Sequence, residues 1–285
     1  MTGAILFCVS RRIVKALSIA ALGLVLCDRG RSEEAITREA AAESAPNKLR
    51  IAVIGAHPDD PEAGVGALIA SLSSQGHDVF IGYAAVYREG RQVLGRPEAE
   101  VRRQEAEEAC AVMRAKPKFF SYSAGRLFPD EAAVADVSKW LDEVKPDIVL
   151  THWPLDTHPD HHAISSIVWQ CYKHEGGWNL YYFEVVTGVQ SLNFTPNLYL
   201  DIEPMLSVKE RAVFCHKSQS PAPPNFWKNH EQMHLDRGAE CGRRYAEALF
   251  LVEAKPGCPL LPLELLPPVA QRGSTTAGAK LSDHP

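Results

Sequence analysis

The chain has 285 residues, 46% of them apolar, which is enough to form a large hydrophobic core in one domain. Its formal net charge is -5 and no block of lysine or arginine is present, which argues against a nucleic acid as partner because phosphate binding needs clustered cations. A small molecule is therefore the expected partner. The seven cysteines contain no C-x-x-C pair, so a zinc ribbon is not expected.

Residues 1–48 differ from the rest of the chain and have the layout of an export signal. A basic start with Arg11 and Arg12 precedes a short apolar run over 16–27 and a polar, alanine-rich stretch over 28–47. The arginine pair is similar to that of a twin-arginine signal. The apolar run is too short to span a bilayer, so no stable membrane span is expected in the mature chain. We expect export to the periplasm or the medium, with a cytoplasmic location as the alternative.

Strands and helices alternate from residue 49 to residue 252. We expect strands over 49–55, 79–86, 119–122, 148–151, 180–185 and 198–202, and helices over 62–75, 97–113, 131–144, 158–174, 204–215 and 232–249. Strands separated by helices of this length need right-handed crossovers into a parallel sheet. The sequence therefore predicts one α/β domain with a mostly parallel sheet flanked by helices.

The last segment, 253–285, is rich in proline, glycine, serine and threonine. A segment of this composition buries too little apolar area to offset the entropy lost on ordering. We therefore expect a disordered tail after the 49–252 domain.

A histidine and two carboxylates, His57, Asp59 and Asp60, directly follow the strand expected over 49–55. They are thereby placed at the carboxyl end of a sheet, where open α/β sheets hold their sites. A carboxylate in such a cleft must be paired or bound to a cation, because an isolated buried charge costs several kcal/mol. A solvated helix N-terminus also favours aspartate, but it does not account for His57.

A second polar cluster, Asp156 to His162, follows the strand expected over 148–151. Since carboxyl ends of parallel strands share one sheet edge, the two clusters can face each other. If a helix begins after Pro159, His158 and His161 lie three residues apart on one face. One of them could then bind a metal while the other points at the substrate.

His57, Asp60 and His161 together form a set of two histidines and one carboxylate. This is the ligand pattern of a catalytic zinc that keeps one position for water. Such an ion lowers the pKa of its water, and Asp59, which is not in the ligand set, would be free to take the proton. Because three protein ligands suffice, we expect the neighbouring His152 to be structural.

Two short motifs, Ala56-His57-Pro58-Asp59-Asp60 and His158-Pro159-Asp160-His161, lie in the two polar clusters, and three further segments are Arg102-Arg103-Gln104-Glu105, His216-Lys217-Ser218-Gln219 and Tyr245 to Phe250. The two motifs resemble the paired signatures of the LmbE-like, or PIG-L, family of zinc-dependent N-acetylglucosaminyl deacetylases. The three segments resemble, in order, the R-x-x-E helix, the H-x-S-Q segment and the closing helix of that family. The likeness extends over about residues 49–252.

The resemblance implies a Rossmann-like fold and hydrolysis of the N-acetyl group of an N-acetylglucosamine-type conjugate, giving acetate and a free amine. It implies one Zn²⁺ held by His57, Asp60 and His161, with Asp59 as general base, His158 as the group that stabilises the oxyanion, Asp160 orienting His158, and Arg102 contacting substrate. The group attached to the sugar and the oligomeric state stay open. So does the role of Arg102, for which a surface ion pair with Glu105 is the alternative.

Three other functions fit these residues less well. A metal-containing sugar-binding protein without catalysis would have no use for the unligated carboxylate of Asp59. A non-haem iron oxygenase uses the same three ligand types, and metal analysis separates it from a zinc enzyme. A dinucleotide site is rejected because Gly55 is not followed by G-x-G-x-x-G glycines, and two carboxylates would repel a pyrophosphate.

Overall fold

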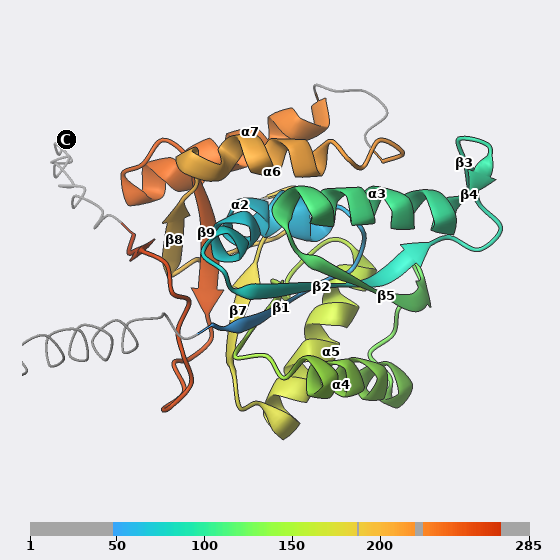
Figure 1. The fold of residues 1–285 in the computed structure, drawn as a ribbon, viewed down its shortest axis with the longest axis horizontal. Coiled ribbons are helices and arrows are strands. Elements are labelled where there is room, and N and C mark those ends of the chain that lie inside the picture. The colour runs from blue at the N-terminus through green and yellow to red at the C-terminus, as the bar shows by residue number, and fades with distance from the viewer. Residues whose placement is uncertain (1–47, 187, 220–224, 269–285) are drawn as a thin grey trace, which may run out of the picture. The chain divides into compact units, whose positions relative to one another are not determined.

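The computed structural model describes residues 48–186, 188–219 and 225–268 (Figure 1). These residues belong to one compact unit that begins at Lys48. The expected export signal falls in residues 1–47 and the end of the expected tail in 269–285, both outside the described residues.

An eight-stranded sheet forms the centre, in the order β10-β8-β9-β7-β6-β1-β2-β5. Five neighbouring strands are parallel: β5 (Lys116–Ser123), β2 (Asp78–Tyr87), β1 (Arg50–Gly55), β6 (Ile148–His152) and β7 (Asn179–Phe183). Antiparallel pairs add β9 (Ala246–Leu251), β8 (Leu198–Asp201) and β10 (Leu265–Leu266). The expected mostly parallel α/β sheet is confirmed. A separate hairpin pairs β3 (Gln92–Val93) with β4 (Arg96–Pro97).

Helices cover both faces of the sheet (Figure 1). One face carries α2 (Asp60–Ser74), α3 (Glu98–Met113), the short helix η1 (Glu203–Met205), α6 (Leu206–Val213) and α7 (Asn225–Cys241), and the other carries α4 (Glu131–Val144) and α5 (Pro159–Glu175). A separate hydrophobic core lies on each face of the sheet, and alternate side chains of β1 pack into the two cores. Ile51 and Val53 belong to one core, and Ala52 and Ile54 belong to the other. Within the described residues, no helix has the length and apolar composition of a membrane span.

The two polar clusters meet because β1 and β6 are neighbours in the sheet. Ile54 near the end of β1 pairs with Thr151 of β6. The turn from His57 to Asp60 and the start of α5 therefore follow adjacent strands at one sheet edge, as the sequence predicts.

The expected helix over 232–249 is wrong in its second half. Helix α7 ends at Cys241, Gly242 adopts φ 73°, and residues 246–251 return as β9. The segment that resembles a closing helix is thus a strand, antiparallel to β7 and β8.

The expectation of a disordered tail is wrong for residues 253–268. Leu261 is buried, and its N–H donates to Tyr181 Oη at 3.2 Å. Further along, β10 pairs with Tyr199 and Leu200 of β8. Strand β10 thus forms one edge of the sheet.

Candidate active site

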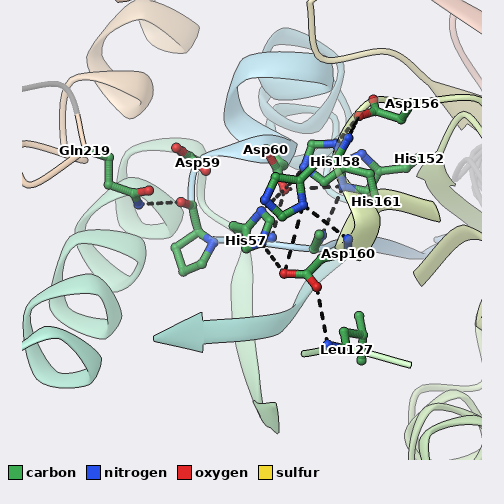
Figure 2. A network of polar contacts seen from close by, with 12 residues as sticks. His57, Asp59, Asp60, Leu127, His152, Asp156, His158, Asp160, His161 and Gln219 are labelled. Carbon is green, nitrogen blue, oxygen red and sulfur yellow. Dashed lines mark hydrogen bonds and ion pairs between the residues drawn. The ribbon is translucent and has the colours of Figure 1, made fainter. Parts of the chain in front are cut away.

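The turn between β1 and α2 sends two adjacent carboxylates in different directions. Asp60 turns back, and its Oδ2 accepts the N–H of His57 at 2.8 Å. Asp59 precedes α2 with φ 119°, a value that non-glycine residues rarely adopt. Figure 2 shows the result: Asp59 lies toward Gln219, while Asp60 lies beside the imidazoles.

The carboxylate of Asp60 is surrounded by three imidazoles. Its Oδ2 lies 3.2 Å from Nδ1 of His57, 3.3 Å from Nε2 of His161 and 3.4 Å from Nε2 of His152. A tetrahedral zinc with bonds of about 2.0 to 2.1 Å keeps its ligand atoms about 3.3 Å apart. The contacts of Asp60 with His57 and with His161 are close to that spacing, so each expected ligand histidine lies beside the Asp60 carboxylate.

Two overlapping groups in the described chain place three possible donor atoms within 4.8 Å of one another. They are His57, His158 and His161, and Asp60, His152 and His161. His152 is the weaker donor because its Nε2 already accepts the N–H of Ala56 at 2.9 Å. Burial, with the charge of His161, lowers its pKa to about 4, so this ring is neutral.

Each expected ligand histidine presents its second ring nitrogen to a carboxylate. Nε2 of His57 lies 2.8 Å from Asp160 Oδ2, and Nδ1 of His161 lies 3.1 Å from Asp156 Oδ1. Carboxylates at this place fix the tautomer and orientation of metal-bound histidines. The arrangement therefore fits a divalent metal ion, and it gives Asp156 a supporting place that the sequence pattern did not single out.

Asp160 contacts a different histidine from the one expected. Its Oδ2 meets His57 and accepts the N–H of Gly125 at 2.6 Å, whereas it lies 4.0 Å from His158. The backbone N–H of Asp160 donates to Nδ1 of His158 at 3.1 Å, and the His158 side chain thereby caps the N-terminus of α5. Since Nδ1 accepts, the neutral ring carries its proton on Nε2, and His158 is oriented by backbone.

The charges at the site favour a cation between the carboxylates. Burial lowers the pKa of His161, but the charges of Asp60 and Asp156 outweigh it and raise that pKa to about 10. Burial and the charge of Asp60 raise the pKa of Asp59 to about 6, against the opposing charge of Arg102. A site that holds protons this strongly on an imidazole also attracts a metal ion.

Arg102 is buried and contacts the backbone of the site. Its Nη2 donates to the carbonyl of Pro58 at 3.1 Å, also contacts Gln219 Oε1, and lies 4.0 Å from Asp59 Oδ1. The alternative of a surface ion pair is wrong, because Glu105 is buried and accepts both the N–H and the Oγ–H of Ser218. The only sequence signal for Ser218 and Gln219 was the resemblance at residues 216–219.

An apolar cavity of about 710 Å³ lies beside α5. Trp153, Trp169, Tyr182 and Phe250 line it together with His162 and two serines, and its lining residues include no Asp, Glu, Lys or Arg. Its edge includes Pro159, next to His158.

Part of the domain is similar to a known protein family. Residues 52–172 match the family described as PIG-L, GlcNAc-PI de-N-acetylase. A diacetylchitobiose deacetylase of Thermococcus kodakarensis is 27% identical over 71% of this chain and 83% of its own length. A probable N-acetyl-α-D-glucosaminyl L-malate deacetylase of Bacillus subtilis is 27% identical over 61% of this chain and 84% of its own.

Solved structures share the fold. The N,N'-diacetylchitobiose deacetylase of Pyrococcus horikoshii superposes with a TM-score of 0.61, at 21% identity, over 79% of this chain and 94% of its own. A 4-carboxy-2-hydroxymuconate hydratase of Pseudomonas putida reaches 0.60 at 21% identity, over 74% and 100%, so the fold alone does not determine the reaction. Residues 52–172, which match the PIG-L family model, contain both paired motifs, and the structure places these motifs at one sheet edge.

Proposed function

We propose that this protein is a zinc-dependent deacetylase that hydrolyses the N-acetyl group of an N-acetylglucosamine-type conjugate, releasing acetate and a free amino sugar. The observation that carries the proposal is Asp59. Its carboxylate faces away from the imidazoles that surround Asp60, although the two aspartates are adjacent in the chain. A metal site that only binds has no use for such a group, whereas a hydrolase needs a base.

The relatives support the substrate class. Diacetylchitobiose and the glucosaminyl malate conjugate, which name the two relatives' substrates, share an N-acetylglucosamine unit and differ in what it is attached to. The shared unit supports an acetylated amino sugar as substrate here. The attached group differs between relatives, so it has to be found by experiment.

His57, Asp60 and His161 would hold the zinc ion, with Asp160 and Asp156 orienting the two imidazoles. When bound, the ion polarises the amide carbonyl and makes water a nucleophile near neutral pH. The donor spacing and the carboxylate behind each ring support this assignment.

Asp59 and His158 supply the proton transfers. Asp59 accepts the proton of the attacking water, and the Nε2–H of His158 donates to the amide oxygen as negative charge develops there. When the carbon–nitrogen bond breaks, the leaving amine takes a proton either from Asp59, which received it from the water, or from His158, and acetate is released. Arg102 would position Asp59 through its hydrogen bond to the Pro58 carbonyl. This role would replace the direct substrate contact implied by the resemblance.

The test is acetate release by the purified full-length chain loaded with one zinc ion. N,N'-diacetylchitobiose, the malate conjugate and an inositol conjugate of N-acetylglucosamine are the substrates to offer. We expect acetate and primary amine in equal amounts from at least one of them, and a loss of both in Asp59→Asn. Binding of a conjugate without acetate release would instead indicate a sugar-binding protein, and iron after anaerobic purification would favour oxygenase chemistry.

A further inference from the structure

The backbone at Asp59 is strained in a way not shared by the other described residues with positive φ. Outside glycine, those residues are Leu94, Arg114, Lys145 and Asn193, and their φ values of 49° to 57° fall in the ordinary left-handed region. Asp59 has φ 119° and ψ -33°, outside that region. Such a conformation persists only where surrounding contacts impose it, and it then points to a functional constraint.

Two hydrogen bonds to one carbonyl group can hold Asp59 in this backbone conformation. The oxygen of Pro58 accepts hydrogen bonds from Gln219 Nε2 at 2.6 Å and from Arg102 Nη2 at 3.1 Å. This oxygen lies in the same peptide plane as the Asp59 nitrogen. Bringing Asp59 to a negative φ means flipping that plane, which would turn the carbonyl away from both donors.

The two donors are themselves held in place. Gln219 Oε1 contacts Arg102, so the amide cannot rotate its donor away without losing that partner. One turn further along α3, Glu105 accepts the N–H of Ser218 at 2.7 Å and its Oγ–H at 2.5 Å. The segment that carries Gln219 is thus attached to the helix that carries Arg102.

We propose that Gln219 is a positioning residue of the reaction: with Arg102 it clamps the Pro58–Asp59 peptide in the orientation that directs the Asp59 carboxylate toward the attacking water and away from the ligand set. The inference rests on the proposed function for the role of Asp59. The clamp itself rests on the backbone geometry and the hydrogen bonds to Pro58.

The kinetic test uses two variants of Gln219. Gln219→Met removes the donor at similar length, and Gln219→Glu keeps an acceptor for Arg102 while removing the donor to Pro58. We expect kcat to fall by about 10- to 100-fold in both, with KM and metal content unchanged, because a small misplacement of a catalytic group has an effect of this size. Gln104→Met, at an exposed glutamine of α3, is the control and should behave as the wild type.

A double-mutant cycle separates positioning from substrate binding. If Gln219 acts through Asp59, Gln219→Met should add no further loss of kcat in an Asp59→Asn background. A full additional loss there, a raised KM with kcat intact, or full kcat in Gln219→Glu would each overturn the proposal.

A crystal structure of Gln219→Met tests the clamp without relying on activity, and it also shows that the variant folds. We expect the Pro58–Asp59 peptide to flip and the φ of Asp59 to become negative. An unchanged φ near 119° would overturn the clamp whether or not the enzyme is active. A flipped peptide in a protein whose wild type releases no acetate would support the clamp and contradict only the proposed function.

Discussion

The carboxylates of Asp59 and Asp60 face different groups, so a neutral amide at each position should have a different effect. Asp59→Asn should keep the metal, because Asp59 lies outside the ligand set, while kcat falls by roughly 10² to 10⁴. Asp60→Asn should lose the metal, since a neutral amide is a weak zinc ligand. Metal content and initial rate, measured on the same preparations, check both. Metal loss in Asp59→Asn with retention in Asp60→Asn would reverse the two roles.

The pKa of Asp59 sets the acidic side of the pH profile. A base must be ionised to accept a proton, so activity should be present above the pKa of Asp59 and lost as the pH falls through it. Burial and Asp60 raise that pKa to about 6, and a nearby metal ion would lower it. We expect the acidic limb of kcat/KM at or below about pH 6, with metal content checked at each pH. A limb above pH 7 would contradict this assignment.

A variant of Asp160 can distinguish two roles: orienting His158, as the resemblance implies, and orienting His57, which the Asp160 carboxylate contacts in the structure. If it oriented His158, Asp160→Asn would lower kcat and leave metal binding intact. Because its carboxylate contacts His57, we expect Asp160→Asn to weaken metal affinity by about 10- to 100-fold. Competition with a chelator measures this affinity. Lys139→Met on the exposed face of α4 is a control that should leave it unchanged.

The sequence predicted which residues meet at the site but not which atoms touch. Motif spacing placed His57, Asp60 and His161 at one sheet edge, since that requires only adjacent parallel strands. Which carboxylate faces which ring depends on side-chain rotamers and on the φ of Asp59, which spacing does not encode. The hydrogen bonds of Arg102 and Gln219 to Pro58 could not be predicted for the same reason.

At the scale of elements, the strand β9 shows where local propensity misleads. Ala246, Glu247 and Ala248 favour a helix by composition. The contacts that make the segment a strand come from elsewhere in the chain: Glu247 is buried, accepts the N–H groups of Ala67 and Leu68 at 2.8 Å each, and pairs with Lys209 at 2.6 Å. The two N–H groups follow a break in α2 at Val65, so Glu247 caps the second part of that helix.

The pair of Lys209 and Glu247 should therefore matter for stability. Both side chains are fully buried. Lys209→Met would leave the Glu247 carboxylate without its cation, so we expect a loss of about 3 to 5 kcal/mol in the free energy of unfolding. Urea unfolding monitored by circular dichroism measures it. Lys139→Met removes an exposed lysine and should change the same quantity little; equal stability of the two variants would show that the buried pair contributes nothing.

At the scale of the whole molecule, the sheet could be predicted because alternating strands and helices leave few topologies. The packing of 253–268 could not, since its proline-rich composition resembles that of a disordered segment. The contacts that order it are supplied by distant residues, namely the hydroxyl of Tyr181 and the free edge of β8. Composition indicates how much apolar area a segment can bury by itself, but it does not indicate which contacts the rest of the chain can make with that segment.

The N-terminal extension gives the last prediction. Arg11-Arg12 and the short apolar run indicate export, and the compact unit begins at Lys48. We therefore propose that the chain is cleaved somewhere within about residues 28–48 and delivered outside the cytoplasm. Cell fractionation with mass spectrometry of the purified N-terminus should find the shortened chain there. Replacing both arginines with lysine should retain it in the cytoplasm at full length if the twin-arginine route is used. A full-length, active protein in the cytoplasm of wild-type cells would show that the extension is not an export signal.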